Sequence, residues 1–235
     1  MKEFYDDKKR EATSTKDVKR ILEKMGFRTV KENNDFKYDL EVVKDNKKYF
    51  VEIKQDFTCY KTNNIGVEYS CRGKLSGIMT SKANIYIYKV HQNPVNAIKA
   101  KNEKEIPSEI KIMQVAKTKL KECIEYIINE NERELEMASL MGRYSENENK
   151  INETKGFQTK TIKTKKGLEY KVTFKLINGG DKDSDSLNVI FKRNSFIENF
   201  SLASFENRLR TDIEKKELHE TLNLRNDILN KKYNS

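Results

Sequence analysis

Two acids and one amine, Asp39, Glu52 and Lys54, are spaced so that a single reversal of the chain would bring them onto one surface. They lie in two short runs, 38–43 and 48–54, in which apolar and polar residues alternate as they do in half-buried strands. Folding one run back on the other would set Asp39 opposite Glu52, with the Lys54 side chain on the same face.

The turn between the two runs sets the register of this predicted hairpin. Asp45-Asn46 is acceptable as a two-residue turn, although Asn-Gly or Asp-Gly would be a stronger signal. With the turn centred there, Leu40 pairs with Val51. The face predicted to be buried carries Leu40, Val42, Tyr49, Val51 and Ile53. The opposite face carries Asp39, Glu41, Phe50, Glu52 and Lys54.

Two carboxylates that face each other in a sheet repel, and a cation bound between them would offset that repulsion. Their opposition therefore indicates a site for a hard cation. Mg²⁺ takes oxygen ligands, keeps much of its water, and is typically held by one or two carboxylates plus substrate phosphate. Such an ion acidifies a bound water and screens the charge that develops on a phosphodiester. Lys54 would orient or deprotonate that water, or stabilise the pentavalent phosphorus.

An ordinary solvated sheet face is the alternative interpretation of the same residues. The chain is 36% charged, and the pattern Glu-x-Lys occurs six times in it, so one copy alone carries little information. Only the copy that begins at Glu52 lies on an alternating strand with an acid at the opposing position. The residues by themselves leave both interpretations open.

Further segments extend the pattern in a fixed order. Asp39 is followed, after a gap of twelve residues, by Glu52-Ile53-Lys54, then by the stretch 64–88. The later segments are Lys117-Thr118, Gly179-Gly180-Asp181, Ser184, Ser186 and a strand at 187–191. This ordered set resembles the PD-(D/E)XK nuclease superfamily, in particular its phage-type members, over roughly residues 10–125 and 178–200. The chain departs from the usual pattern because Tyr38 stands where proline precedes the first aspartate.

The resemblance implies a role for each polar group of the hairpin. Asp39 and Glu52 would ligate Mg²⁺ or Mn²⁺, and the backbone carbonyl of Ile53 would be a further ligand. Lys54 would take the role of the catalytic amine.

Three other acids are candidate metal ligands. Many members of that superfamily add an acid from the first helix, and Glu11 and Glu23 are both candidates here. Glu68 lies on the next predicted strand, where it would be either an extra ligand or a solvent-facing side chain between buried neighbours.

A phosphate-binding surface is predicted in the loop from residue 61 to residue 82. Gly73 and Gly77 would let backbone amides approach phosphate, and basic side chains would position a strand without reading its bases. The predicted nucleic-acid-binding residues are Arg72, Lys74, Ser76 and Lys82. Ordinary solvated loop charges are the alternative.

Composition favours a polyanionic partner. The 235 residues carry a formal net charge of +10, with a pI of about 9.2, which suits nucleic acid and DNA first of all. A codon bias toward lysine and asparagine would raise the charge as well. The length is sufficient for one core of fair size.

Sequence signals for membranes and export are weak. The sequence holds no apolar run of 18 residues, so no membrane partner is expected, and its N-terminus lacks the apolar segment of a signal peptide. The three cysteines form no Cys-x-x-Cys pattern and are expected to be reduced thiols. We therefore expect a cytoplasmic protein, in the host cytoplasm if a phage encodes it.

The expected fold is an α/β domain over residues 1–200, with a mixed central sheet flanked by helices. The resemblance implies that this is a restriction-endonuclease-like core. Because the resemblance resumes at Gly179, a helical or β insertion is expected at about 128–177. Residues 201–235 are expected to form a C-terminal helical extension.

Local patterns predict the individual elements. In the extension, the spacing of Phe205, Leu209 and Ile213 favours a helix, which would pack on its own domain or form a homodimer contact. Other expected elements are a helix from 13–15 to Gly26 with Val18, Ile21, Leu22 and Met25 inward, a helix at 117–140, strands at 27–30, 65–69, 85–90 and 168–177, and a helical turn at 76–83. The segment 110–115 is ambiguous.

Together these patterns predict a metal-dependent endonuclease that hydrolyses DNA phosphodiester bonds. One alternative is a catalytically inactive nuclease fold that binds nucleic acid or serves in an assembly. The other is the same chemistry on RNA, since nothing in the sequence discriminates the 2′-hydroxyl group.

Overall fold

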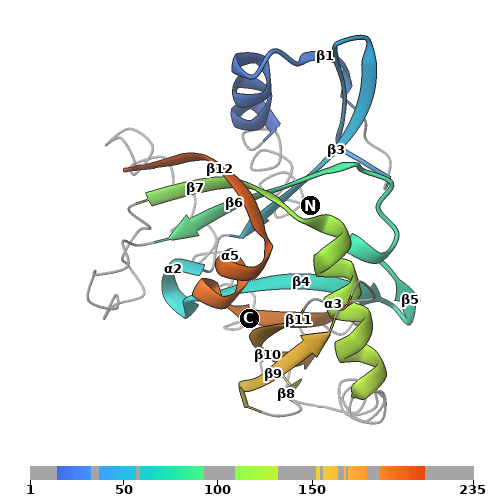
Figure 1. The fold of residues 1–235 in the computed structure, drawn as a ribbon, viewed down its shortest axis with the longest axis vertical. Coiled ribbons are helices and arrows are strands. Elements are labelled where there is room, and N and C mark those ends of the chain that lie inside the picture. Colours follow the sequence, from blue (N-terminus) through green and yellow to red (C-terminus); the bar gives the residue numbers. More distant parts are fainter. Residues whose placement is uncertain are drawn as a thin grey trace, which may run out of the picture.

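The computed structural model describes most of the chain between residues 15 and 209 (Figure 1). The described ranges are 15–32, 37–56, 59–92, 109–131, 152–153, 156–163, 167, 169–178 and 186–209. They form two β-sheets and a few helices. The fold is therefore of the mixed α/β type, with a mixed central sheet, as the sequence predicts.

The first sheet has the strand order β1-β2-β3-β6-β7-β12. Its strands are β1 (Arg28–Glu32), β2 (Leu40–Lys44), β3 (Lys47–Asp56), β6 (Ile85–Gln92), β7 (Glu109–Val115) and β12 (Ser201–Leu209). Strand β3 runs parallel to β6, and the other neighbouring pairs are antiparallel.

The predicted hairpin is confirmed in its register. Leu40 pairs with Val51, so the strands β2 and β3 meet as the alternation indicates. Asp45 and Asn46 both have positive φ angles, 50° and 58°, which is the conformation of a type I′ turn. This turn follows the right-handed twist of the two strands, and it keeps the register from slipping.

The second sheet has the order β5-β4-β11-β10-β8, with β9 also paired to β10. Its strands are β4 (Asn64–Cys71), β5 (Lys74–Leu75), β8 (Asn152–Glu153), β9 (Gln158–Lys163), β10 (Glu169–Asn178) and β11 (Ser186–Lys192). The strand predicted at 65–69 exists, but it does not continue the sheet of the hairpin. Strand β6 occupies the place beside β3, and β4 pairs instead with β11.

Three described strands from the expected insertion at 128–177, namely β8, β9 and β10, belong to this second sheet. Strands β9 and β10 bury Ile162, Val172 and Phe174 in the same core as β4 and β11. Strand β10 runs across residue 177 to Asn178 and pairs with β11 through Phe174↔Phe191. The boundaries of the insertion stay a prediction.

Among the described residues, the helices are 15–24, α2 (Cys59–Thr62), α3 (Lys117–Glu130), α5 (Arg193–Phe200) and the 3₁₀ turn η1 (Gly77–Met79). Helix 15–24 buries Val18, Ile21 and Leu22 as predicted, but Met25 is 37% exposed because the chain turns away at Gly26, whose φ is +84°. Within the described residues, no helix combines the length and the apolar character needed to cross a bilayer.

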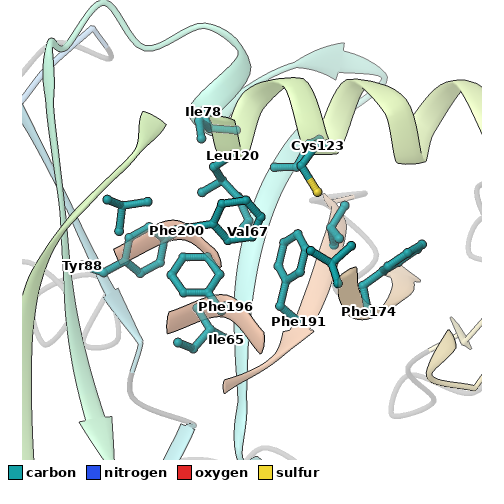
Figure 2. Close-up of a cluster of buried hydrophobic side chains, with 14 of the residues drawn as sticks. Ile65, Val67, Ile78, Tyr88, Leu120, Cys123, Phe174, Phe191, Phe196 and Phe200 are labelled. Atoms are coloured by element: carbon teal, nitrogen blue, oxygen red, sulfur yellow. The ribbon is translucent and has the colours of Figure 1, made fainter. Parts of the chain in front are cut away.

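Two cores lie on opposite faces of the first sheet. Helix 15–24 covers one face, where Leu22 packs with Leu40, Val51 and Ile87. The other face looks toward the second sheet, and helices α3 and α5 help to fill the space (Figure 2). This larger core contains Tyr86, Tyr88, Leu120, Phe174, Phe191, Phe196 and Phe200.

The prediction that the tail is helical from residue 201 is wrong for 201–209. These residues form strand β12, which pairs antiparallel with β7 through Ser204↔Met113. The backbone of β7 would otherwise be an open sheet edge, and pairing satisfies it, which outweighs the helical spacing of the apolar residues. The rest of the expected extension, 210–235, and the dimer contact predicted there lie outside the described residues.

Candidate functional site

Asp39 is fixed at the point where the hairpin opens. Its backbone N–H donates to the carbonyl of Val51 at 2.8 Å, and its Oδ2 accepts a hydrogen bond from the N–H of Ile53 at 2.6 Å. Strand β2 begins at the next residue, Leu40, whereas β3 continues to Asp56. The Asp39 carboxylate therefore takes the place that a further strand residue would have beside β3.

The carbonyl of Ile53 points toward the same edge of β3. Along a strand, the N–H and C=O groups of every second residue face the same neighbour. The Val51 carbonyl and the Ile53 N–H both bond to Asp39, so the Ile53 carbonyl also faces that side. The Ile53 carbonyl and the Asp39 carboxylate therefore lie at the same edge of β3, and their role as metal ligands stays a prediction.

Glu52 lies on the face of β3 that looks toward the second sheet, and it is only 6% exposed. Its Oε1 is 2.6 Å from the Nζ of Lys54, and its Oε2 accepts a hydrogen bond from the Ser81 hydroxyl at 3.2 Å. A buried carboxylate needs such partners, because desolvation is costly. The Lys54 side chain, at 40% exposure, reaches solvent. Glu52 is thus more buried than an ordinary solvated sheet face would make it.

Tyr86 of β6 pairs with Glu52 of β3, and its hydroxyl group is affected by the charges of several acids. Burial raises the pKa of its hydroxyl above the usual range, and the neighbouring Tyr88 adds to this effect. The negative charges of Glu52, Asp39 and Glu68 raise it further. Three of the five candidate acids, from β3, from the residue before β2 and from β4, therefore act on the same hydroxyl group through their charge.

Glu68 is held by two hydroxyl groups. Ser76 donates to its Oε1 at 2.7 Å, and Ser186 of β11 donates to its Oε2 at 3.0 Å. The turn η1 presses on the same residue, because a Cβ atom built on Gly77 would lie 2.4 Å from the Glu68 carbonyl oxygen. Ser76, predicted to bind nucleic acid, thus serves to orient Glu68.

The other predicted nucleic-acid-binding residues lie on exposed turns. Arg72 has a φ of 53° and, with Gly73, makes the tight turn between β4 and β5, with Lys74 directly after it. Lys82 is exposed, and its backbone N–H donates to the carbonyl of Lys37.

Of the two helical acids that are candidate ligands, the one within the described residues, Glu23, lies away from this site. Glu23 lines a cavity of about 430 Å³ between helix 15–24 and β1, and that helix packs on the sheet face opposite Glu52. Glu11 lies outside the described residues. Within the described part of the chain, no three acidic, histidine or cysteine side chains lie close enough together to hold a metal ion by themselves.

The donor set nevertheless fits the expected ion. Mg²⁺ commonly binds to one or two carboxylates and takes its remaining ligands from water and phosphate. Asp39 and Glu52, with the Ile53 carbonyl at the same strand, provide such a partial set of oxygen ligands.

Two residues with no predicted role are joined to Glu52. Ser81 donates its hydroxyl proton to Glu52, and Lys117 donates from Nζ to the carbonyls of Ser81 at 2.6 Å and Ala83 at 2.8 Å. Burial and the charge of Lys121 lower the pKa of Lys117, while the charge of Glu52 acts in the opposite direction. Lys117 stands in the ordered set of the resemblance, but the sequence gives no signal for Ser81, because loop contacts have no periodicity.

The remaining reactive side chains lie elsewhere. His91 is buried, with its Nε2 2.6 Å from the amide nitrogen of Gln55 on the face covered by helix 15–24. The thiols of Cys59 and Cys123 are buried, which raises the pKa of each to about 12 and makes them poor nucleophiles.

The candidate site therefore consists of Asp39, Glu52 and Lys54 at the open end of the hairpin, with Glu68 and Ser81 beside them. It combines carboxylate oxygens, an ammonium group that reaches solvent, and a wall supplied by the second sheet. Comparisons with protein-family models, with curated proteins and with solved structures find no match for this chain.

Proposed function

We propose that this protein is a metal-dependent endonuclease that hydrolyses DNA phosphodiester bonds. The observation that supports this most directly is the buried Glu52, paired with Lys54 and close to Asp39 at the open end of one hairpin. A mixed sheet with helices on both faces is also the architecture that the resemblance to PD-(D/E)XK nucleases implies.

In this proposal Asp39, Glu52 and the Ile53 carbonyl hold Mg²⁺ or Mn²⁺, with Glu68 as a further acid beside them. The bound ion supplies an acidified water and screens charge on the phosphodiester. The N–H of Ile53 keeps the Asp39 carboxylate in place, so the ligand is oriented before substrate arrives. Lys54 reaches solvent from the buried Glu52. As an ammonium group it would stabilise negative charge on the phosphate, and only as a neutral amine would it accept a proton from the attacking water.

The other parts of the proposal follow from charge and chemistry. A net charge of +10 suits DNA as the partner, and exposed Arg72, Lys74 and Lys82 would contact its backbone. Cytoplasmic location, in the host cytoplasm if a phage encodes the chain, fits the three free cysteines.

A plasmid-nicking assay tests the proposal. We expect cleavage with Mg²⁺ or Mn²⁺, none with EDTA, and its loss in Asp39→Asn, Glu52→Gln and Lys54→Met. Glu41→Gln is the matched control, because Glu41 lies on the same hairpin and pairs with Lys48 at 2.7 Å instead.

Circular dichroism shows whether each variant is folded. Folded Glu52→Gln that cuts at the rate of the wild type would remove Glu52 from the mechanism. Binding of DNA without cleavage under all metal conditions would favour the non-catalytic binding module.

A further inference from the structure

A cavity of about 710 Å³ opens where strand β7 passes into helix α3. Ala83 and Lys117 line it, and both belong to the connection that reaches Glu52 through Ser81. Its volume is within the range of ligand-binding pockets. The cavity therefore adjoins the candidate catalytic site.

The wall of this cavity is strongly basic. Lys117, Lys119 and Lys121 all line it, and Glu122 is the one acid among its described lining residues. Helix α3, all of which is described, has no acidic residue in its first turn, so its dipole adds to the positive potential there.

The three ammonium groups are held in place by neutral oxygen atoms. Lys117 donates to the carbonyls of Ser81 and Ala83, Lys119 to that of Asn199 at 2.8 Å, and Lys121 to that of Met79 at 3.2 Å. Carbonyl oxygens orient an ammonium group but do not cancel its charge. Burial and the like charge of Lys121 lower the pKa of Lys117, as expected for two ammonium groups that line one cavity. An anion in the cavity would relieve the repulsion between these like charges.

One apolar side chain lies at the same cavity. Leu202 of β12 is 64% exposed and lines the cavity together with the lysines of α3. A polyanion with a charged backbone, and with apolar surface on its sugar carbons and base faces, matches this combination better than a small inorganic anion does.

We propose that this cavity binds the phosphate backbone of the DNA strand next to the bond that is cut, with Lys117 and Lys121 as its phosphate contacts. The assignment rests on the proposed function, and it names where the substrate lies. Ser81 joins the cavity wall to Glu52, so a strand held by Lys117 is brought beside the candidate metal ligands.

Salt-dependent binding tests this assignment without requiring cleavage. Affinity for a labelled DNA duplex is measured in EDTA over a salt series, with full-length protein carrying Glu52→Gln. Each lost phosphate contact reduces the slope of log K against log[salt] by about 0.9, or about eightfold in affinity near 0.1 M salt. We expect that loss for Lys121→Met, whose aliphatic chain is kept, and recovery in Lys121→Arg.

Lys31→Met is the matched control, because Lys31 is an exposed lysine on β1, at the opposite edge of the first sheet from β12. Equal slopes for Lys121→Met and Lys31→Met would overturn the assignment. If the wild type cuts DNA while those slopes are equal, only the assignment fails. If the slope depends on Lys121 but no metal ion supports cleavage, the proposed activity fails and the binding site stands.

Discussion

Replacing Gly77 by alanine measures how closely the turn η1 packs against Glu68. Gly77 has a φ of +54°, and an added Cβ would lie 2.4 Å from the Glu68 carbonyl oxygen and 3.2 Å from its carbonyl carbon. The obstacle is backbone, so it cannot rotate away as the end of a flexible side chain would. Either η1 or strand β4 must move, and Glu68 moves with it.

Two other glycines separate the contributions to the expected loss. Gly73 also has a positive φ, +71°, but nothing lies within 4 Å of its added Cβ, and Gly156 has open space without a positive φ. The left-handed conformation costs an alanine about 1–2 kcal/mol. Forcing an atom into a packed contact adds about 1–3 kcal/mol. Gly156→Ala should be neutral or slightly stabilising, Gly73→Ala should lose about 1–2 kcal/mol, and Gly77→Ala about 2–5 kcal/mol.

Urea denaturation followed by circular dichroism gives the three free energies of unfolding. Cleavage, measured where both glycine variants remain folded, should fall more for Gly77→Ala than for Gly73→Ala, because only the former displaces Glu68. If Gly77→Ala loses no more stability than Gly73→Ala, then η1 does not pack closely against the Glu68 backbone, and the reasoning from that contact is wrong.

Two further predictions concern the surroundings of the site. Asp56→Ala should lower the free energy of unfolding by about 1–3 kcal/mol, because the N–H groups of Cys59 and Gly66 lose their acceptor. Urea titrations measure this loss, and a value under about 0.5 kcal/mol would contradict the prediction. Stability should also fall as pH rises from 9 toward 12, since the folded protein holds the Cys59 and Cys123 thiol protons to about 12 while unfolded thiols lose theirs near 9. Urea midpoints at pH 8 and pH 10 measure that change, and it should shrink in the double Cys→Ala variant.

The hairpin could be predicted from the sequence because its determinants are local. A two-residue turn, an alternating pattern on each side and the pairing of Leu40 with Val51 all lie within a few residues of one another. The helix predicted from residue 117 begins at Lys117, and its apolar residues at helical spacing, Leu120, Ile124 and Ile127, are fully buried.

The pairing of strands that are distant in the sequence could not be predicted from the sequence alone. Strand β4 has the alternation of a strand, but nothing in it states that its partner is β11, more than a hundred residues later. Likewise, the spacing of Phe205 and Leu209 suits a helix. These residues form a strand instead, because they pair with the edge of β7 that would otherwise be open. Periodicity predicts the element but not its neighbour.

The same distinction explains the site. Its two hairpin acids could be predicted, but the burial of Glu52 could not, because the cover comes from distant segments. Glu68 is oriented by Ser186, which is 118 residues away in the sequence, and Ser81 reaches Glu52 from a loop.

The second sheet is therefore part of the candidate site and not a separate addition to it. Tyr88 of the first sheet donates its hydroxyl to the Gly66 carbonyl at 3.4 Å, and Asp56 accepts from the Gly66 N–H, so β4 is fastened to the face that carries Glu52. Strand β11 then holds β4 along its length and supplies Ser186 to Glu68. A change that loosens β11 would reach the acids through β4, even though β11 has no residue among the predicted metal ligands.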